Sequence, residues 1–427
     1  MQSIRGMRDV LPAEARRWQR VETETIRTLE SFGYEEIRLP LLESTELFSR
    51  GLGEATDAVE KEMYNLLDRD GEKLSLRPEG TASCVRAGLQ HGLIFNQTPR
   101  LWYRGPMFRY ERPQKGRYRQ FDQIGAEVFG VAGADVDAEL IQMSAILFRS
   151  LGLSRELRLE LNTLGSAESR RAYRDALVAY LTPRRDALDV DSQRRLERNP
   201  LRILDSKDAA TRAVLEGAPT LTDYLDGESK AHFDGVRRLL DALQIGYVVN
   251  PRLVRGLDYY THTVFEWITD ALGSQGTVCA GGRYDGLVEQ LGGRPTPGAG
   301  FAVGVDRLVL LHEALGQGVR AEPVDGYCVV LDDAHQAWAM ATCQRVRDAL
   351  PQLRLRRNAG GGKLKNQMKR ADASGANFAL IVGEDEVAND EVTLKWLRAD
   401  LPQERLSPAA LIRRLAGWLD ARDGLRE

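Results

Sequence analysis

Several features that define common protein classes are absent from this sequence. No apolar run approaches the roughly 18 residues needed to span a bilayer, and the N-terminus lacks the apolar segment of a secretory signal peptide. The four cysteines, at positions 84, 279, 328 and 343, form no C-x-x-C pair, which excludes the usual zinc and redox motifs. Lys and Arg (59) nearly balance Asp and Glu (62), so the chain is not a globally basic nucleic-acid binder. We therefore expect a cytoplasmic protein.

The commonest nucleotide-binding and hydrolase motifs are also missing. Residues 360–363 resemble the end of a P-loop, but Leu364 stands where the magnesium-binding hydroxyl should follow. Residues 298–304 have one residue too many for a G-x-G-x-x-G fingerprint. No H-E-x-x-H or G-x-S-x-G motif is present. If the chain uses ATP, it binds ATP with another fold.

The composition, with 427 residues, 43% apolar and 28% charged, is that of a globular protein of two or three domains. Apolar periodicity predicts helices over 18–32 and 136–151, and strands over 34–40, 73–77, 100–111, 120–130, 247–250 and 259–267. Residues 166–240 show only helical spacing, and residues 327–382 alternate between strand and helix patterns after a linker at 316–323. We therefore predict a core at 1–165 and 241–318, a helical insertion at 166–240, and an α/β domain at 325–427.

The strongest strand signal is a predicted antiparallel hairpin around residues 100–130. Side chains alternate along a strand, so Gln123 and Glu127 share one face beside Gly125, which leaves room for a ligand. Arg109 and Glu111 share a face of the partner strand, where an arginine suits a planar anion such as phosphate. Surface ion pairs are the alternative explanation of these charges. The loop between the strands is basic, which favours either a phosphate-rich partner or a solvated face.

Other segments carry candidate ligand-binding side chains. Glu79 and Thr81 follow a predicted strand and would grip an ammonium group, or Thr81 would cap a helix. Arg255 lies just before two tyrosines and a strand, and residues 280–285 place further polar side chains after glycines, which let a ligand approach the backbone. Residues 300–308 form a glycine-spaced strand that enters a helix, with Arg307 in its first turn. That strand would form a flat floor for an aromatic ring, with Arg307 on a phosphate; ordinary helix–strand packing is the alternative.

In this order, the segments resemble one family. Residues 33–40, 108–130 and 300–307 are similar to motifs 1, 2 and 3 of the class II aminoacyl-tRNA synthetases. The runs LVRGLDYY, ending at Tyr260, and CAGGRYD, ending at Asp285, resemble the two signatures of the histidyl-tRNA synthetases. The resemblance covers essentially the whole chain. It departs at Tyr110 and Asp122, where some bacterial members have histidine, and at Ala126, where cysteine is common; we assign catalysis to none of these.

The resemblance implies an α+β catalytic domain, with an antiparallel sheet flanked by helices, and a homodimer formed through the motif 1 segment. It also implies that the insertion contacts the tRNA acceptor stem and that the C-terminal domain reads the anticodon. Independently of the resemblance, the C-terminal domain contains basic residues without intervening acids, which suits contact with an RNA backbone: Arg354, Arg356, Arg357, Lys363, Lys365, Lys369 and Arg370.

The reaction that the resemblance implies is ATP-dependent activation of L-histidine to histidyl-adenylate, followed by transfer to the 3′ end of tRNA(His). Arg109 and Arg255 would hold the α-phosphate, Arg307 the γ-phosphate and Arg117 the β/γ end, with Mg²⁺ bridging the outer phosphates. The ATP site as a whole would comprise Arg109, Glu111, Arg117, Arg255 and Arg307. The histidine site would comprise Glu79, Thr81 and Gln123 at the ammonium group, Glu127 and Tyr260 at the imidazole, and Tyr259 and Tyr284 along the walls. Arg112 and Gln114 would contact the tRNA.

Two other functions are compatible with parts of this pattern. A synthetase-like regulatory subunit of ATP phosphoribosyltransferase would bind histidine without charging tRNA, but such proteins typically lack the C-terminal domain and several catalytic residues. A class II synthetase for proline or threonine would not require the signatures around Arg255 and Tyr284. A simple RNA-binding module would not need Gln123 and Glu127 on one strand face.

Overall fold

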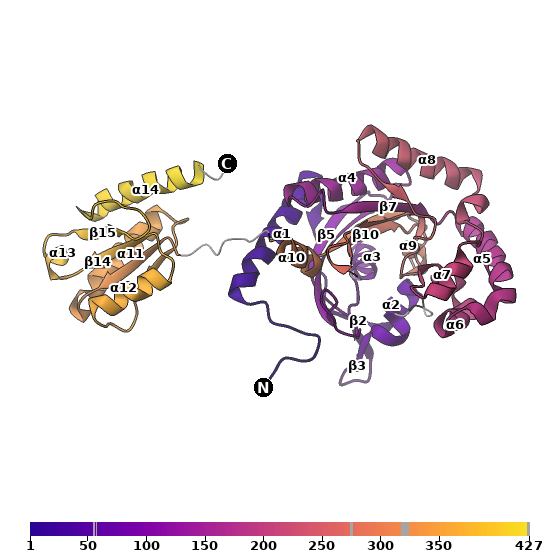
Figure 1. The fold of residues 1–427 in the computed structure, drawn as a ribbon, viewed down its shortest axis with the longest axis horizontal. Coiled ribbons are helices and arrows are strands. Elements are labelled where there is room, and N and C mark those ends of the chain that lie inside the picture. Colours follow the sequence, from indigo (N-terminus) through magenta and orange to yellow (C-terminus); the bar gives the residue numbers. More distant parts are fainter. Residues whose placement is uncertain (54–55, 57, 274–275, 317–323, 425–427) are drawn as a thin grey trace. The chain divides into compact units, whose positions relative to one another are not determined.

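The computed structural model describes residues 1–53, 56, 58–273, 276–316 and 324–424 (Figure 1). The chain divides into two compact units, residues 1–319 and residues 320–427. Among the described residues, none of the helices combines the length and apolarity needed to cross a membrane. The predicted linker at 316–323 lies, apart from Gly316, outside the described residues.

The first unit is built on a mixed eight-stranded sheet. Six central strands are antiparallel, and a short parallel strand lies at each edge. The antiparallel sheet is therefore confirmed. The two edge strands, whose parallel pairing the prediction did not include, make it a mixed sheet. In spatial order the strands are β1 (Glu35–Glu36), β5 (Arg100–Phe108), β6 (Gln120–Phe129), β11 (Gly298–Gly304), β10 (Thr277–Arg283), β9 (Thr261–Ile268), β7 (Arg158–Thr163) and β8 (Val248–Val249).

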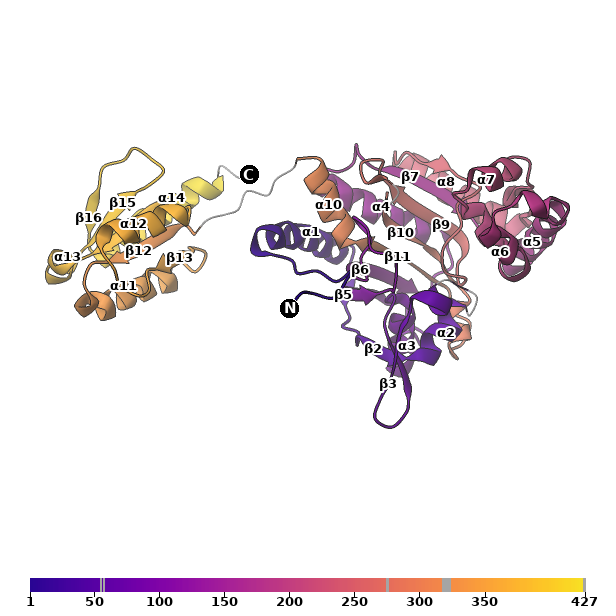
Figure 2. The ribbon, with the colours of Figure 1, turned by 60° about the horizontal axis from the view of Figure 1, so that its bottom comes forward.

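Helices cover one face of this sheet and form the main core there (Figures 1 and 2). The strands send alternate apolar side chains into this core, including Ile124, Ala126 and Val128 of β6, as the alternation predicts. The other face carries the small and polar side chains of β6 and β11, together with apolar side chains of β5. The covering helices are α1 (Pro12–Ser31), α4 (Ala134–Ser150) and α10 (Val305–Ala314), with α8 (Gly227–Ala242) against α4.

A small layer that the sequence predicted only in part covers the opposite side of β5 and β6. Its apolar residues, such as Phe48 and Leu52, join a second core with Tyr103 and Tyr284. The sequence predicted only its central strand, because the other pieces are too short to show a period. The layer comprises the sheet β2 (Leu42–Ser44), β4 (Lys73–Leu76), β3 (Tyr64–Leu67), the helices α2 (Thr45–Leu52), α3 (Thr81–Gln90) and α9 (Leu287–Gln290), and a π-helical turn (Ala58–Glu62).

Between β7 and β8 the chain is helical. Each of four helices begins at a side chain that accepts a hydrogen bond from a backbone N–H three residues on: Ser166, Asp189, Asp208 and Asp226. These caps satisfy N–H groups that the first turn leaves unpaired, which explains where the helices start. The helices are α5 (Ala167–Leu181), α6 (Val190–Arg198), α7 (Ala209–Leu215) and α8, with 3-10 turns at Thr182–Ala187, Pro200–Asp205 and Leu221–Tyr224.

Several predicted strands are shorter than expected, including 100–111, which ends at Phe108, and 247–250, which pairs only at Val248–Val249. In two others, side chains bind the backbone. The strand predicted over 34–40 pairs only at Glu35–Glu36. Beyond it, Nη1 of buried Arg77 donates to the Leu39 carbonyl at 3.1 Å, and Pro40 has no N–H to offer a neighbouring strand. The strand predicted from residue 259 begins at Thr261, since the Tyr260 carbonyl instead accepts from Arg170 at 2.6 Å.

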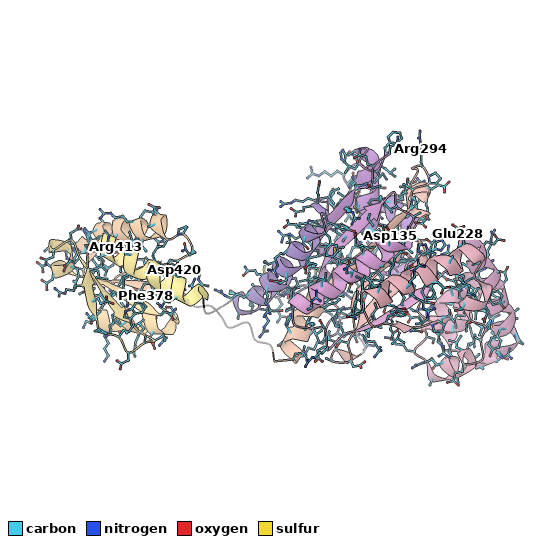
Figure 3. The ribbon with its side chains drawn as sticks, turned by 90° about the horizontal axis from the view of Figure 1, so that it is seen from above. Asp135, Glu228, Arg294, Phe378, Arg413 and Asp420 are labelled. Atoms are coloured by element: carbon cyan, nitrogen blue, oxygen red, sulfur yellow. The ribbon has the colours of Figure 1, made fainter. Side chains whose placement is uncertain are left out.

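The second unit is the predicted α/β domain. Phe378, labelled in Figure 3, lies at its centre, with ring centroids 5.7 Å from Trp396 and 5.7 Å from Trp418. Its sheet has the order β13 (Leu355–Arg357), β12 (Gly326–Val330), β14 (Phe378–Val382), β15 (Val392–Trp396), β16 (Glu404–Leu406), parallel on the β12 side and antiparallel from β14 onward. Its helices are α11 (Gln336–Ala349), α12 (Leu364–Ala373), α13 (Glu384–Ala388) and α14 (Pro408–Gly424), with a 3-10 turn at Asp333–His335.

Replacing Phe378 by alanine should lower the free energy of unfolding of the second unit by about 3–5 kcal/mol, because the change removes a fully buried ring and leaves a cavity. Urea unfolding followed by tryptophan fluorescence would measure the loss. Arg413→Ala, on the exposed side of α14, is the control and should shift stability by no more than about 0.5 kcal/mol. A loss for Phe378→Ala below about 1 kcal/mol would contradict this account of the core.

Candidate active site

The open face of the sheet carries small residues at its centre and polar ones at its margins. Gly300 lies opposite Glu127, and Gly304 opposite Gln123, across the β6–β11 pair. Ala302 lies opposite Ala280, which in turn lies opposite Glu266 of β9. Directly paired residues on antiparallel strands point to the same side. The small residues therefore form a floor between polar side chains, as the glycine spacing predicted.

Glu127 is the centre of a buried hydrogen-bond group. Its carboxylate accepts from the Tyr103 hydroxyl at 2.8 Å and the Thr81 hydroxyl at 2.8 Å, and also from the Tyr284 hydroxyl. The side chain is only 1% exposed. Burial raises its pKa to about 8, although the three hydroxyl donors act in the opposite direction. A cationic or N–H-bearing ligand group placed here would favour the ionised carboxylate, which burial disfavours.

The glycines near Glu127 make room for protein side chains as well as for a ligand. A Cβ at Gly300 would lie 1.8 Å from the Glu127 carboxylate, and a Cβ at Gly125 would lie 2.4 Å from the Tyr103 hydroxyl. The expectation that Gly125 leaves space for a ligand is therefore corrected, because the Tyr103 ring occupies that space. Tyr103 was missed from the sequence. Only the strand register, which sets Tyr103 opposite Gly125, identifies it.

Glu79 and Thr81 divide their roles differently from either prediction. The two oxygens of Glu79 accept from the backbone N–H of Thr81 at 2.6 Å and of Ala82 at 2.9 Å, so Glu79 caps α3. Burial raises the pKa of Glu79, against these hydrogen bonds and the charge of Arg109. The Thr81 hydroxyl is directed to Glu127 rather than to the helix end. The predicted cap through Thr81 is thus wrong, because the side chain that accepts from the helix N–H groups is Glu79. Both side chains border the pocket of Glu127.

Three tyrosines predicted for the site meet beside Glu127. The ring centroids of Tyr259 and Tyr260 are 4.6 Å apart, and that of Tyr284 lies 5.6 Å from Tyr259 and 6.5 Å from Tyr260. All three rings are buried. The wall they form has polar hydroxyl edges, which suits a planar ligand that also makes hydrogen bonds.

The predicted arginines gather at the other margin of the floor. Arg109 follows β5, and its Nε donates to the Pro78 carbonyl at 2.9 Å. Arg307 donates to the Gly116 carbonyl at 3.2 Å and the Thr277 carbonyl at 2.5 Å. Arg255 pairs with Glu266, and Arg117 with Glu111. Glu266 was missed; its only sequence signal is a charge between two buried aromatic residues of one strand.

These arginines lie close enough to repel one another. Burial, followed by the charges of Arg109 and Arg117, lowers the pKa of Arg307 to about 10. Burial also lowers the pKa of Arg109. The charges of Glu62 and Glu79 act to raise this pKa, and the charge of Arg255 acts to lower it. For Arg255, burial is outweighed by Glu266 and the neighbouring phenols, which raise its pKa. A cluster of partly buried guanidinium groups on one sheet face has the charge and the donor geometry that suit a multiply charged anion.

The two residues predicted to contact tRNA are on the surface, unlike the partly buried arginines. Arg112 and Gln114 are exposed in the loop between β5 and β6. Backbone hydrogen bonds between Gln114 and Arg117, at 3.0 Å and 2.9 Å, shape that loop. The described residues contain no group of three or more His, Cys, Asp or Glu side chains arranged to hold a metal ion.

Comparison with known proteins agrees with this geometry. Residues 6–308 match the family described as Histidyl-tRNA synthetase. The chain belongs to this family. Residues 327–418 match the family described as Anticodon binding domain.

Solved structures support the assignment to the family. The crystal structure of apo histidyl-tRNA synthetase from S. aureus is 35% identical, with a TM-score of 0.81, over 97% of this chain and 99% of that one. Histidyl-tRNA synthetase from Nostoc sp. PCC 7120, at 19% identity and TM-score 0.68, shares the fold over 98% of this chain and 99% of that one. An ATP phosphoribosyltransferase regulatory subunit/histidyl-tRNA synthetase from Bacillus halodurans C, at 24% identity and TM-score 0.64, does so over 90% and 98%.

The raised pKa of Glu127 predicts a pH dependence of stability. Between its ordinary pKa and about 8, the folded protein holds a proton that the unfolded chain releases, so stability falls as pH rises through this range. Glu127→Gln removes the titrating group, and its free energy of unfolding should fall less between pH 5 and pH 8, as urea titrations would measure. Asp241→Asn, an exposed carboxylate of α8, should follow the wild type. Parallel curves for Glu127→Gln and wild type would refute the shifted pKa.

Proposed function

We propose that this chain activates L-histidine with ATP to form histidyl-adenylate and then transfers the histidyl group to the 3′ end of tRNA(His). Family membership carries the reaction class, histidine–tRNA ligation. The observation that carries the chemistry is the placement, on one open sheet face, of the arginine cluster beside the buried pocket of Glu127. One end suits a triphosphate, and the other suits a small cationic amino acid.

In the first step, an oxygen of the histidine carboxylate attacks the α-phosphorus of ATP, and the bond to the β-phosphate oxygen breaks to release pyrophosphate. Negative charge builds on the α-phosphate during this step, and fixed cations stabilise it. We assign Arg109 and Arg255 to the α-phosphate, Arg307 to the γ-phosphate and Arg117 to the β/γ end. Glu111, paired with Arg117, fixes the direction of that guanidinium group at the ATP site.

We assign the pocket of Glu127 to the histidine side chain. Glu127 would accept a hydrogen bond from one imidazole nitrogen and Tyr260 would bind the other, with Tyr259 and Tyr284 as walls. Glu79, Thr81 and Gln123 would surround the α-ammonium group. A site that hydrogen-bonds both ring nitrogens rejects an analogue without them by about 10⁴–10⁵-fold, because its own buried groups would be left unpaired.

Mg²⁺ would accompany ATP as part of the substrate. This ion keeps several waters and binds mainly through phosphates and one or two carboxylates, so it needs no dedicated protein cage. The margin of the arginine cluster offers such carboxylates, at Glu62, Glu111 and Glu266. The charge that Mg²⁺ supplies would neutralise the outer phosphates.

For the transfer step, we propose three contacts with the tRNA. The exposed loop residues Arg112 and Gln114 would meet the acceptor end, and the helical insertion, residues 166–240, would meet the acceptor stem. The domain at 325–427 would read the anticodon, consistent with its family match at 327–418. Its predicted basic residues include exposed Arg356, Lys363 and Lys365.

We propose that the protein works as a homodimer in the cytoplasm. A groove of about 730 Å³ runs along the motif 1 segment and α3, lined in part by Ile37, Leu39 and Arg86. Next to it, Leu41 and Leu42 are each 42% exposed. Apolar side chains on the surface at this segment support a second copy of the chain as its partner, and sedimentation equilibrium would test it. The four buried free cysteines are consistent with a reducing compartment.

ATP–pyrophosphate exchange, measured with each standard amino acid and without tRNA, should occur with histidine alone. This outcome follows from adenylation in a pocket that reads the imidazole. Binding of histidine without any exchange would instead favour a regulatory histidine-binding protein, an alternative that the second unit and the complete arginine set already disfavour.

Replacing Arg255 by alanine should slow the exchange reaction by about 10²–10³-fold, because it removes a charge that stabilises the transition state. Steady-state exchange kinetics at saturating ATP would measure the effect. Arg149→Ala, an exposed arginine of α4, is the matched control and should keep the wild-type rate. An Arg255→Ala variant with normal turnover would disprove the role given to this residue.

Replacing Glu127 by alanine should raise the KM for histidine far more than the KM for ATP, because the carboxylate is assigned to the imidazole. The two constants would be measured separately in the exchange assay. If both rise equally, Glu127 serves the fold rather than the amino acid.

A further inference from the structure

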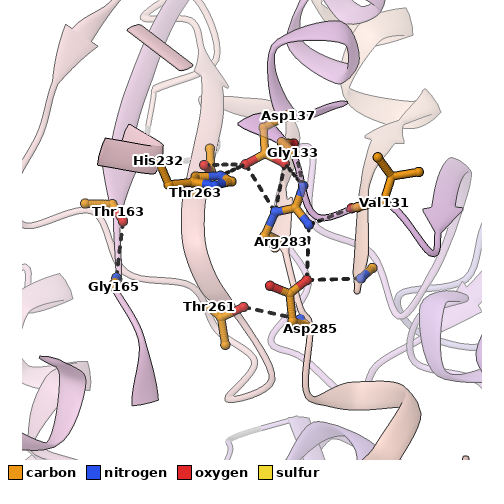
Figure 4. Close-up of polar contacts among 11 residues, drawn as sticks. Val131, Gly133, Asp137, Thr163, Gly165, His232, Thr261, Thr263, Arg283 and Asp285 are labelled. Carbon is orange, nitrogen blue, oxygen red and sulfur yellow. Dashed lines mark hydrogen bonds and ion pairs between the residues drawn. The ribbon is translucent and has the colours of Figure 1, made fainter. Parts of the chain in front are cut away.

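A second buried polar network lies behind the amino-acid pocket, on the side away from the arginine cluster. Figure 4 shows its centre, the Asp137 carboxylate in the first turn of α4, which is 2% exposed. Asp137 accepts from Nη2 of Arg283 at 2.6 Å and from the Thr263 hydroxyl at 2.5 Å. Nε2 of His232, from α8, lies 2.7 Å from the same oxygen that Thr263 contacts. Three segments distant in sequence therefore converge on one carboxylate.

Arg283 has every N–H group satisfied in this network. Its Nε and Nη2 donate to Asp137, Nη2 also to the Gly133 carbonyl, and Nη1 to the Val131 carbonyl and to Asp285. The side chain is fully buried. A guanidinium fork held at all five positions has one orientation only. The backbone at residue 283 is consequently fixed against the start of α4.

This clamp encloses Tyr284, the next residue along the chain. Asp285, on its other side, accepts from Arg283 at 3.1 Å and from the Gly298 N–H at 3.1 Å. The Tyr284 hydroxyl donates to Glu127. A Cβ at Gly298 would lie 2.6 Å from the Tyr284 ring, so the ring rests directly on the neighbouring strand. The direction of the hydroxyl thus depends on where Arg283 and Asp285 are held.

The network also holds the segment that carries Tyr259 and Tyr260. Thr263, bound to Asp137, lies three residues after Tyr260 at the start of β9. Between them, His262 has a φ of +44°, a backbone conformation uncommon for residues other than glycine, and its ring lies 5.3 Å from that of His232. Such a conformation persists where the surroundings impose it. Asp137 and His232 supply part of those surroundings.

We propose that Asp137 is a positioning residue for histidine recognition, and that His232 makes the helical segment between β7 and β8 part of the same device. Asp137 touches no substrate. It aligns Tyr284 through Arg283 and aligns the Tyr259–Tyr260 segment through Thr263, and His232 ties α8 to that alignment. The inference rests on the proposed function, since it assigns these tyrosines to bound histidine.

The charge state of Asp137 supports this positioning role. Burial disfavours the ionised form of Asp137, but the hydrogen bond from His232 and the pairing with Arg283 outweigh burial and lower its pKa. Asp137 is therefore a carboxylate with a full set of donors. Removing the His232 donor should weaken the position of Asp137 relative to Thr263 and Arg283, while the Asp137–Arg283 ion pair remains.

The test compares KM for histidine and KM for ATP in the exchange assay, together with histidine binding by calorimetry in the absence of ATP. Asp137→Asn removes the charge and should raise the histidine KM and dissociation constant by roughly tenfold, as loss of a charged hydrogen-bond partner does, with the ATP KM within about twofold. Because this substitution leaves Arg283 buried without its strongest ion pair, the variant risks misfolding.

His232 variants keep the inference falsifiable in that case, because the His232 side chain reaches the surface, with 13% exposed. His232→Ala should raise the histidine KM several-fold and leave the ATP KM unchanged. His232→Gln, whose amide can donate to Asp137 as the ring does, should restore the wild-type value. Arg238→Ala, exposed on the same helix, is the control and should match the wild type in both constants.

The outcomes separate the inference from the proposed function. If the wild-type protein neither binds histidine nor catalyses exchange with it, the proposed function fails. If the wild type is active and His232→Ala only lowers the melting temperature, with the histidine constants unchanged, Asp137 and His232 are structural and the positioning inference is wrong. Equal changes in the histidine and ATP constants would overturn it as well.

Discussion

The candidate pocket depends on a buried carboxylate held by hydroxyl groups rather than by a cation. Glu127 projects from the middle of the sheet and accepts hydrogen bonds from three such groups. It can take this position only because residue 300, directly opposite, has no side chain. Tyrosines and a threonine then close around it from β5, α3 and the end of β10. Because its shell is uncharged, Glu127 keeps a proton up to about pH 8, and a positive or N–H-bearing group would favour its ionised form, which is the property a binding site for an amino acid requires.

The arginine cluster presents the opposite situation. Like charges held near one another in a partly buried site raise the free energy of the protein until an anion neutralises them. The acidic partners, Glu266 and Glu111, reduce this cost in the absence of ligand. A triphosphate would replace those pairings with contacts to its own oxygens. One face of the sheet thus carries two different electrostatic environments, the arginine cluster and the pocket of Glu127. Between them lies a row of glycine and alanine residues, whose small size leaves the surface open.

Much of this organisation could be predicted from the sequence, and the limits have identifiable physical causes. The alternating pattern predicted over 327–382 ends at the residue where β14 ends, because a buried apolar run bounded by Asn377 and Gly383 has sharp ends. β6 and the long α4 were predicted within two residues for similar reasons. The strand expected over 34–40 was too long, since a side chain far along the chain, Arg77, binds its backbone. Short strands such as β2 and β16 carry too few residues to show a period.

The site residues were likewise predictable where a local sequence pattern carries them. Residues in recognisable motifs, including Arg109, Glu127, Arg255 and Arg307, were predicted for the site, and the fold brings them to one face of the sheet. Tyr103, Glu266 and Asp137 were not, because each acquires its role from a partner across the sheet or from another helix. Strand register and helix docking are properties of the folded chain, and no local pattern encodes them. Interactions that support a site are therefore harder to predict than the groups that perform its chemistry.

The Asp137–Arg283 pair joins positions 146 residues apart, and the site draws on residues from Glu79 to Arg307. Contacts of such long sequence separation close late, because the entropy of a long loop must be overcome before they form. During synthesis, a nascent chain that has not yet emerged as far as α10 lacks part of the phosphate-binding cluster, whatever helices it has formed. The pocket and the clamp behind it therefore cannot be complete until residues 79–307 have all been synthesised. Competence to bind substrate would then coincide with completion of that unit's core.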